Sequence, residues 1–250
     1  MPMSASGCPR PPTMDPQIPH PMLQEEHMDR IINFDNFHSA SKLDQQAQSI
    51  LLRPNATLDA ALINSAAEGL PPISVLPLAG HYLSILTRVM GAKNVLEVGT
   101  LGGYSSICFA QAGAKVTSIE MNPKHRDVAL KNVEGLDVTV LLGTAEDVLP
   151  RLVNEGKQFD LVFVDADMIG LEELYEWAVK LTRPNGCIFL DDVVASMFRH
   201  DQVGKEGENI LNRVGKDERV DATLVPTVLT HPMVPHPVFN GFIFATVNGG

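Results

Sequence analysis

The strongest constraint on the fold is a glycine-rich segment that follows a short apolar run. The stretch from Val95 to Val98 predicts a buried strand, and Gly99-Thr-Leu-Gly-Gly103 predicts a turn into a helix from Tyr104 to about Ala112. A strand that passes through such a turn into a helix is typical of doubly wound α/β folds, in which ligands bind beyond the carboxyl ends of the strands. The segment therefore predicts an α/β fold with a ligand at this turn.

The spacing of the glycines indicates which ligand binds there. A dinucleotide fingerprint needs Gly-x-Gly-x-x-Gly, whereas Gly99 is followed by Thr100 and Leu101 before the next glycine. Glu97, two residues before Gly99, would repel a diphosphate but can accept a hydrogen bond from an amine-bearing ligand. Both features favour S-adenosylmethionine, which carries an ammonium and a sulfonium, over a nicotinamide dinucleotide.

A second predicted strand, Lys115 to Ile119, ends in the acidic residue Glu120. In doubly wound folds an acid about twenty residues beyond the glycine turn accepts hydrogen bonds from ribose hydroxyls. Both nucleoside cofactors would use this residue, so it supports a nucleoside without choosing between them.

The composition predicts one globular domain and excludes some partners. The chain has 250 residues, of which 44% are hydrophobic and 20% charged. A net charge of -11 without a cluster of Lys and Arg argues against nucleic acid and anionic membrane surfaces. The three cysteines, Cys8, Cys108 and Cys187, are too scattered for a disulfide framework or a zinc site. Reduced thiols, the absence of a secretory signal pattern and the absence of a long apolar run predict a cytoplasmic protein.

The amino-terminal part divides into a tail and a helical cap. Residues 1–21 are rich in proline and predict a disordered tail. The remaining chain, 22–250, is predicted as one domain whose helical cap, 22–92, contains helices over 22–37, 57–68 and 78–90. These helices precede the first strand, where they can cover a cofactor, shape a substrate entrance or form a subunit contact.

Beyond Glu120 strands alternate with helices, which predicts a parallel sheet with right-handed crossovers. A turn is predicted over 183–186 and a helix near 206–214. The last two strand-like runs are joined by a proline-rich loop too short for a crossover helix, so they predict an antiparallel hairpin. The predicted strands in this part are 137–142, 159–164, 187–190, 222–228 and 239–247, and the predicted helices begin near Pro123, Glu146 and Leu171. The predicted fold is doubly wound, with five parallel strands, a carboxyl-terminal hairpin and helices on both faces.

Four aspartates follow two of the predicted parallel strands: Asp165, Asp167, Asp191 and Asp192. They should lie at the same sheet edge as Gly99. Clustered carboxylates disfavour joint ionisation unless they are protonated, paired or metal-bound, and oxygen ligands suit Mg²⁺ or another hard divalent cation. The alternative, that each one only caps a following helix, stays open for any single aspartate.

At this point the chain resembles a known family, the small cation-dependent, S-adenosylmethionine-dependent O-methyltransferases that include the catechol and caffeoyl-coenzyme A enzymes. The resemblance covers about residues 58–247. Five motifs carry it: Gly69-Leu-Pro-Pro-Ile-Ser74, Leu96-Glu-Val-Gly-Thr-Leu-Gly-Gly-Tyr-Ser105, Glu120-Met-Asn-Pro123, Asp160-Leu-Val-Phe-Val-Asp-Ala-Asp167 and Leu190-Asp-Asp-Val-Val194. It implies a Rossmann-like methyltransferase sheet and a homodimer, with the amino-terminal helices as candidate interface.

The resemblance also implies roles for individual residues. Val75, Glu97, Gly99 and Ser105 would hold the methionine part of the cofactor, Glu120 would bind the ribose, and Thr144 and Ala145 would lie near the adenine. The further cofactor-binding residues would be Thr100, Gly103, Met121 and Asp165. The metal ligands would be Asp165, Asp191 and Asp192, and the metal would acidify a substrate hydroxyl and aim it at the methyl group.

Two residues depart from the family pattern. Met168 replaces the usual lysine that aids deprotonation, and Asp192 replaces the usual asparagine. Several interpretations stay open. The substrate can be acidic enough to ionise with metal help alone, or a histidine can act as base: His81, assigned here with Asp165 as a catalytic residue, or His200, His231 or His236. Alternatively, the four apolar residues Met168, Phe198, Met233 and Phe239 line an apolar pocket.

These observations lead to a ranked set of hypotheses. The first is a Mg²⁺-assisted O-methyltransferase that acts on a small hydroxylated aromatic or secondary metabolite, with nitrogen methylation left open. The second is the same fold without methyl transfer, serving as a cyclase-like catalyst or a binding protein because Met168 replaces the lysine. A nicotinamide oxidoreductase comes third because the glycine spacing disfavours it.

Overall fold

The computed structural model describes residues 39–166, 170–205, 207, 209–230 and 237–249. From Ala40 on, the described residues belong to one compact unit, Ala40–Gly250. The predicted tail over 1–21 and the predicted helix over 22–37 lie outside the described residues. So do Asp167, Met168, His231, Met233 and His236.

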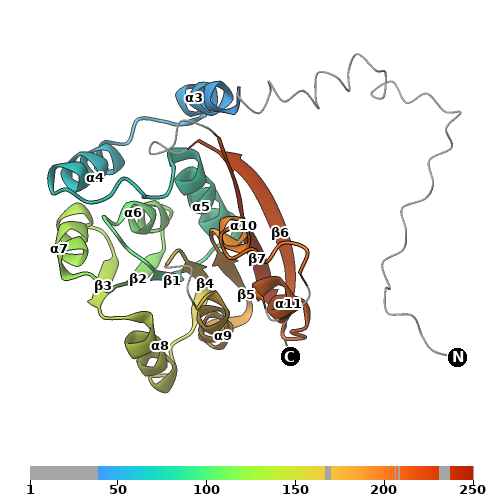
Figure 1. Ribbon diagram of the computed structural model, residues 1–250. Coiled ribbons are helices and arrows are strands. Elements are labelled where there is room, and N and C mark those ends of the chain that lie inside the picture. Colours follow the sequence, from blue (N-terminus) through green and yellow to red (C-terminus); the bar gives the residue numbers. More distant parts are fainter. Residues whose placement is uncertain (1–38, 167–169, 206, 208, 231–236, 250) are drawn as a thin grey trace, which may run out of the picture. The chain divides into compact units, whose positions relative to one another are not determined.

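The centre of the unit is a seven-stranded sheet with the order β3-β2-β1-β4-β5-β7-β6 (Figure 1). Neighbouring strands from β1 to β5 are parallel, β7 runs antiparallel to β5, and β6 runs antiparallel to β7. The predicted parallel sheet and the predicted carboxyl-terminal hairpin are confirmed. The strands are β1 Asn94–Val98, β2 Lys115–Glu120, β3 Val138–Leu142, β4 Phe159–Val164, β5 Thr182–Leu190, β6 Val220–Leu229 and β7 Val238–Val247.

Helices cover both faces of this sheet, as predicted. Figure 1 shows α5, α6 and α7 on one face and α8, α9 and α11 on the other, and α4 packs outward on α6 and α7. The helices are α3 Ala40–Leu51, α4 Ala56–Ala67, α5 Pro77–Met90, α6 Tyr104–Gln111, α7 Pro123–Asn132, α8 Ala145–Asn154, α9 Leu171–Leu181, α10 Val193–Arg199 and α11 Ile210–Gly215. In the described part of the chain, no helix is both long and apolar enough to cross a membrane.

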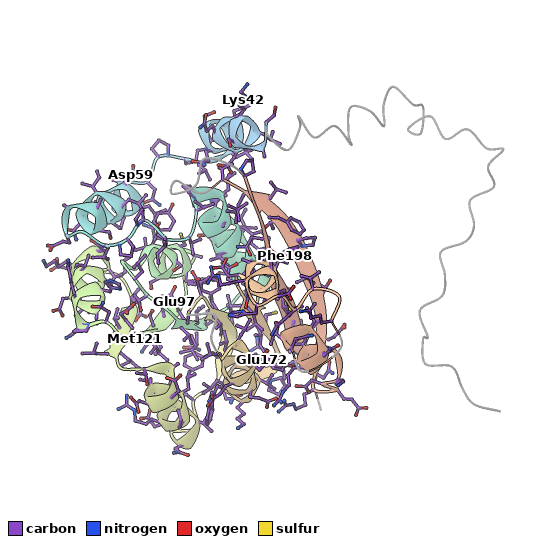
Figure 2. The ribbon with its side chains drawn as sticks, in the orientation of Figure 1. Lys42, Asp59, Glu97, Met121, Glu172 and Phe198 are labelled. Atoms are coloured by element: carbon purple, nitrogen blue, oxygen red, sulfur yellow. The ribbon has the colours of Figure 1, made fainter. Side chains whose placement is uncertain are left out.

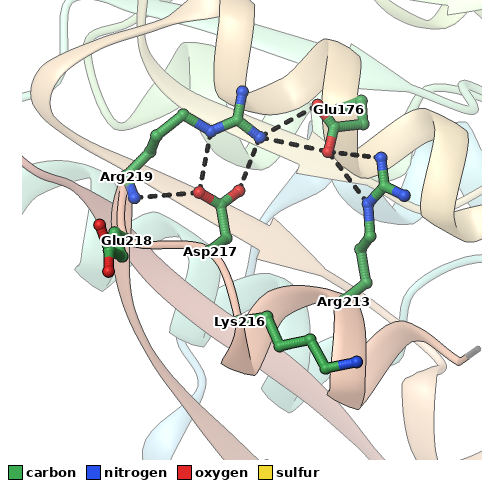
Figure 3. Close-up of a pocket in the computed structure, with 6 residues that line it drawn as sticks. All are labelled: Glu176, Arg213, Lys216, Asp217, Glu218 and Arg219. Atoms are coloured by element: carbon green, nitrogen blue, oxygen red, sulfur yellow. Dashed lines mark hydrogen bonds and ion pairs between the residues drawn. The ribbon is translucent and has the colours of Figure 1, made fainter.

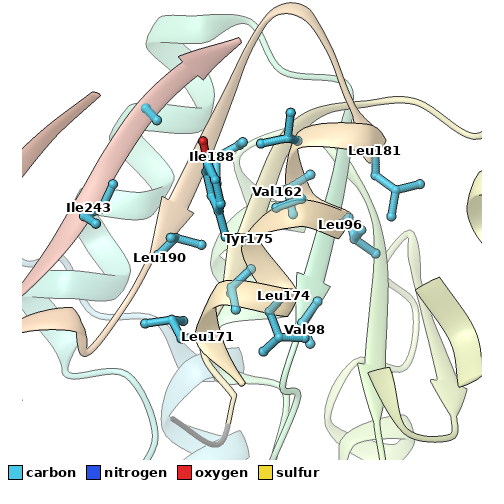
Figure 4. Close-up of a cluster of buried hydrophobic side chains, with 14 of the residues drawn as sticks. Leu96, Val98, Val162, Leu171, Leu174, Tyr175, Leu181, Ile188, Leu190 and Ile243 are labelled. Atoms are coloured by element: carbon cyan, nitrogen blue, oxygen red, sulfur yellow. The ribbon is translucent and has the colours of Figure 1, made fainter. Parts of the chain in front are cut away.

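Each central strand buries side chains on both of its faces, as expected when helices cover a parallel sheet twice. On one face Leu96 and Val98 of β1 pack with Val162 of β4 against α9, whose Tyr175 is fully buried (Figure 4). On the other face Val95 packs in a cluster with residues of α5 and α6. This two-sided burial holds the ends of the strands in fixed positions, and the candidate site is built on those ends.

The start of β5 corrects one prediction. The segment 183–186, predicted as a turn, lies within β5, which begins at Thr182. The pairing of β4 with β5 shifts register there, so these residues form a bulge, and Asn185 has a left-handed φ of 59°. Arg183 Nε donates to Asp160 Oδ1 over 2.5 Å and ties the bulge to β4. The turn-like residues bend the strand without ending it.

Three helices differ from the predictions. The analysis of the sequence predicted neither α3, which has no fully buried residue to give it an apolar pattern, nor α10, which follows β5 directly. The helix predicted near 206–214 is α11, which begins at Ile210 because Asn209 caps it by accepting a hydrogen bond from the amide of Asn212.

Candidate cofactor and carboxylate site

The candidate site lies at the carboxyl edge of the parallel strands. Backbone hydrogen bonds continue the ladder one residue past the strand ends: the Gly99 amide donates to the Ile119 carbonyl over 3.0 Å, and the Asp165 amide donates to the Val98 carbonyl over 2.9 Å. The Asp191 amide donates to the Val164 carbonyl over 2.9 Å in the same way. These bonds place the glycine turn and two of the predicted aspartates side by side along the edge.

Gly99 is at a position that only glycine fits. Its φ is +99°, and a Cβ built there would lie 1.9 Å from the carbonyl oxygen of Asp165. The backbone of the turn therefore comes close to the backbone after β4. Gly103, which precedes α6 with a φ of +82°, ends the turn. The predicted glycine-rich join between strand and helix is confirmed as local structure.

Glu97 is a fully buried carboxylate inside the fold (Figure 2). Its Oε2 accepts hydrogen bonds from the hydroxyls of Ser106 and Ser118. Its Oε1 is buried, and no hydrogen-bond donor from the described residues reaches it. We call Oε1 the open oxygen. Buried polar atoms nearly always have a partner, so an open oxygen on a buried carboxylate points to a donor outside the described residues, such as a ligand.

The environment of Glu97 acts on its ionisation in two directions. Burial raises the pKa of Glu97 above its ordinary value, and the charge of Glu120 adds to the rise. The hydroxyls of Ser106 and Ser118 oppose the rise because they donate to the charged form, and the nearby hydroxyl of Ser105 acts in the same direction without a hydrogen bond to either oxygen. A cationic ligand at the open oxygen would favour the charged form further.

Glu120 ends β2 and is also buried. Its carboxylate accepts hydrogen bonds of 2.8 Å from the amides of Leu101 and Asn122, one from the glycine turn and one from the start of α7. His125 Nδ1 lies 3.8 Å from Oε1 of this carboxylate. Glu120 thus fixes the glycine turn, and a carboxylate can still accept further hydrogen bonds from a ribose.

The remaining predicted cofactor residues are spread around the same edge. Thr100 and Ser105 are buried in the turn and the first turn of α6, and Thr144 caps α8 by accepting from the amide of Asp147. Ala145 begins α8, and Val75 packs against the cluster on the α5 and α6 face. Met121 is 68% exposed.

The predicted metal ligands repel one another. Burial, followed by the charges of Asp191, Asp192 and Glu97, raises the pKa of Asp165 well above its ordinary value. Burial and the charge of Asp192 raise the pKa of Asp191 to about 7. The carboxylates are therefore near enough to disfavour joint ionisation, as the sequence predicts.

Asp192 has a partner that the sequence analysis missed. Asn240 of β7 donates its side-chain amide to Asp192 Oδ1, and its own Oδ1 accepts from the Ala195 amide over 3.1 Å. The Asp192 amide in turn donates to Asp191 Oδ1 over 2.8 Å. Within the described ranges, no three His, Cys, Asp or Glu side chains are arranged as the ligands of one metal ion. The donor chemistry suits a hard divalent cation, but the geometry is not that of a formed metal centre.

Two of the candidate bases, His81 and His200, lie among the described residues. His81 lines a cavity of about 620 Å³ with residues of α3, α4, α5 and α6, Tyr104 and Cys108 among them. Neither Asp165 nor the other predicted metal ligands line this cavity. His200, at the end of α10, directs Nδ1 at the Ser196 carbonyl over 3.0 Å.

Two of the four residues of the suggested apolar pocket are in contact. Phe198 of α10 and Phe239 of β7 meet edge to face, with ring centroids 5.8 Å apart, and both are about half exposed. Phe239 directly precedes Asn240. The aromatic pair therefore lies on the elements that carry Asp192 and its partner.

A second hollow, of about 390 Å³, is lined by an ion-pair network (Figure 3). Arg219 donates to both Asp217 and Glu176, and Arg213 also donates to Glu176. Tyr175 donates its hydroxyl to Asp217 over 2.8 Å. These contacts join α9, α11 and the start of β6, so we assign this network a structural role.

The edge residues fit S-adenosylmethionine better than a diphosphate cofactor. The open oxygen of Glu97 lacks a donor from the described chain, and the amino-acid end of that cofactor carries an ammonium. Gly99 lets the backbone of the turn pack directly against the backbone at Asp165, which keeps Glu97 and Asp165 at one edge of the sheet. The fold and this edge define the class of the S-adenosylmethionine-dependent methyltransferases.

Comparison with known proteins narrows the class. The family model described as O-methyltransferase matches residues 55–229. A catechol O-methyltransferase of Niastella koreensis is 39% identical over 182 residues, which cover 67% of this chain and 82% of that protein. An O-methyltransferase from Bacillus cereus, solved in complex with SAH, superposes with a TM-score of 0.75 at 33% identity and covers 86% of this chain and 99% of its own. The O-methyltransferase TomG from Streptomyces achromogenes, solved in complex with SAM, superposes with a TM-score of 0.72 at 29% identity. The match covers 87% of this chain and 100% of that chain.

The chain therefore belongs to the O-methyltransferase family and is an S-adenosylmethionine-dependent O-methyltransferase. The sequence predicted this family from its motifs. It did not reveal Ser106, Ser118 or Asn240. Only Ser118 left a signal, since it lies in the predicted strand that ends in Glu120, two residues before that acid.

Proposed function

We propose that this enzyme transfers the methyl group of S-adenosylmethionine to a hydroxyl of a small hydroxylated aromatic compound of the catechol type, with help from a divalent cation, Mg²⁺. The observation that carries the proposal is the open oxygen of the buried Glu97 at the carboxyl edge of the sheet. The substrate class is supported by the catechol O-methyltransferase among the relatives.

In this proposal the cofactor lies along the sheet edge. Glu97 accepts from the ammonium of the methionine part, the glycine turn from Gly99 to Gly103 lies beside the cofactor, and Glu120 accepts from the ribose. Thr144 and Ala145 lie near the adenine, and Asp165 closes the site from the end of β4. When bound, the cofactor supplies an activated methyl group on a sulfonium, and the chain has to position the acceptor and exclude water.

The cation is proposed on the chemistry of its donors. Asp165, Asp191 and Asp192 are oxygen ligands whose mutual repulsion a divalent cation would relieve. A bound Mg²⁺ would supply Lewis-acid chemistry. Because Asn240 holds Asp192, binding of the ion through all three carboxylates requires Asp192 to turn or to use its second oxygen. A homodimer in the cytoplasm, with the amino-terminal helices at the interface, completes the proposal.

Calorimetric titration tests the function. S-Adenosylmethionine is titrated into the full-length protein with Mg²⁺ and again after chelation, followed by methyl-transfer assays with catechol and simple phenols. We expect binding in both cases and turnover of catechol that chelation removes. Turnover that persists in chelator would contradict the role of the cation. Binding without turnover on a broad set of hydroxylated acceptors would favour the alternative, a methyltransferase fold that no longer transfers methyl because Met168 replaces the usual lysine.

A further inference from the structure

A chain of hydroxyl groups holds Glu97 from three elements. Ser106 of α6 and Ser118 of β2 donate to Glu97 Oε2, and Thr100 of the glycine turn shares a hydrogen bond of 2.5 Å with the Ser118 hydroxyl. Ser118 is the cross-strand partner of Glu97 in the pairing of β1 with β2. All three hydroxyl residues are at most 2% exposed. We call Thr100, Ser106 and Ser118 the hydroxyl chain.

The direction of donation along this chain follows from the number of protons. The Ser118 hydroxyl has one proton, which it donates to Glu97 in a hydrogen bond. It must therefore accept in its contact with Thr100, and the Thr100 hydroxyl is the donor. The Thr100 carbonyl accepts from the Gly103 amide over 2.8 Å, which anchors the end of the chain in the glycine turn.

The hydroxyl chain treats the two oxygens of Glu97 differently. Both donors reach Oε2, whereas none of the described residues donates to Oε1. Donors to the carboxylate favour its charged form and lower the pKa of Glu97 against the effect of burial. The result is a buried carboxyl group in which one oxygen accepts two hydrogen bonds and the other oxygen is open. If Glu97 served packing alone, burial of the open oxygen would cost desolvation free energy that no hydrogen bond offsets.

We propose that Thr100, Ser106 and Ser118 are positioning residues for the cofactor. They hold the other oxygen of Glu97 in place and thereby direct the open oxygen at the ammonium of the methionine part. The inference rests on the proposed placement of S-adenosylmethionine at this edge. According to this inference, the hydroxyl chain makes the enzyme prefer ligands that carry the amino-acid end over ligands that lack it. The three hydroxyl groups do so through Glu97, without contacting the ammonium themselves.

Two ligands separate this role from a purely structural one. S-Adenosylhomocysteine carries the ammonium, and 5′-methylthioadenosine has the same nucleoside without the amino-acid end. Titration calorimetry measures both against the wild type, Ser118→Ala and Ser106→Ala. Loss of a donor to a buried charge should weaken S-adenosylhomocysteine by about tenfold to a hundredfold in each variant. The affinity for 5′-methylthioadenosine should stay within about twofold, because its contacts do not involve Glu97.

The conservative variant and a matched control complete the test. Ser118→Thr keeps the hydroxyl and should restore most of the affinity for S-adenosylhomocysteine. Ser84→Ala removes a partly buried hydroxyl that donates to the Cys108 carbonyl and not to Glu97, and it should change neither affinity. Thermal melting of each variant checks that it is folded, and Ser106→Ala carries the test if Ser118→Ala does not fold.

The outcomes distinguish this inference from the proposed function. Equal losses for both ligands, or no loss for S-adenosylhomocysteine, in folded variants would overturn the positioning role while leaving the enzyme a methyltransferase. A wild type that binds neither ligand would instead contradict the placement of the cofactor itself.

Discussion

The side-chain amide of Asn240 donates to the carboxylate of Asp192, and this bond connects the first part of β7 to the end of β5. Asp192 has a left-handed φ of 58° and directly precedes α10. Asn240 is buried and also accepts from the Ala195 amide, so both ends of its side chain are used. The pair thus joins a predicted metal ligand to the hairpin.

The first prediction concerns this pair. Asn240→Asp sets a second carboxylate against Asp192 in a buried place and should lower the melting temperature more than Asn240→Ala, which costs about 1 to 3 kcal/mol by leaving partners unsatisfied. Mg²⁺ should recover part of the loss in Asn240→Asp. Thermal melting with and without Mg²⁺ measures both effects. Asn248→Ala, which removes an exposed bond to the Glu218 carbonyl, is the control. Equal melting temperatures for Asn240→Asp and the wild type would contradict the assignment.

The second prediction concerns Gly99. Gly99→Ala adds a Cβ 1.9 Å from the Asp165 carbonyl oxygen at a φ of +99°, which forces the glycine turn away from β4. We expect the free energy of unfolding to fall by more than about 3 kcal/mol. We also expect that cofactor binding is no longer measurable. Denaturant titration and calorimetry are the measurements.

A matched control separates strain from collision at Gly99. Gly113 has the same φ of +99°, and within the described structure nothing lies within 4 Å of its added Cβ. Gly113→Ala should therefore cost only the backbone strain, about 1 to 2 kcal/mol, and leave cofactor binding intact. Similar losses in the two variants would show that the close approach to Asp165 is unimportant.

The sequence predicted the parts of the fold that depend on local patterns. Strand ends and turns depend on residues that are close together in the sequence. The apolar runs, the glycine turn and the acids at the strand ends therefore predicted β1 to β5, and with them the edge on which Gly99, Glu120 and Asp165 lie. The hairpin of β6 and β7 followed from the short proline-rich loop. These elements agree with the structure to within a few residues, apart from the early start of β5.

The contacts that complete the site could not be predicted because they join distant residues. Asn240 lies 48 positions from Asp192, and Ser118 lies 21 positions from Glu97. A serine in a strand or an asparagine far along the chain has many possible partners, and only the register of the sheet selects one. The cavity that His81 lines has the same origin, since it depends on how α5 packs on α6.

The third prediction is a pH dependence at the ion-pair network. The hydrogen bond from Arg219 lowers the pKa of Asp217 to about 2, from an ordinary value near 4. A lowered folded-state pKa means that Asp217 contributes stability above the ordinary value and loses it as the pH falls toward 2. Asp217→Asn should therefore be less stable than the wild type at pH 7, and the difference should shrink between pH 4 and about 2.

Denaturant titrations at several pH values measure this difference. Asp201→Asn is the control, because Asp201 is 87% exposed in its pair with Lys205 and should contribute little at any pH. A stability difference for Asp217→Asn that stays constant down to pH 2 would contradict the role of its charge.

The fourth prediction tests the carboxylate cluster without relying on turnover. Asp191→Asn keeps the shape of the side chain and removes one of the charges that repel Asp165. Without divalent cations, at pH 8, this variant should melt at a higher temperature than the wild type, because the wild type has to bury charges that repel one another.

Added Mg²⁺ should raise the melting temperature of the wild type by binding to the native state, and it should raise that of Asp191→Asn much less. Asp221→Asn on the exposed start of β6 should behave as the wild type in both conditions. A cation-free Asp191→Asn that melts below the wild type, together with an undiminished response to Mg²⁺, would mean that the carboxylates are stabilised within the protein and that the cation binds elsewhere.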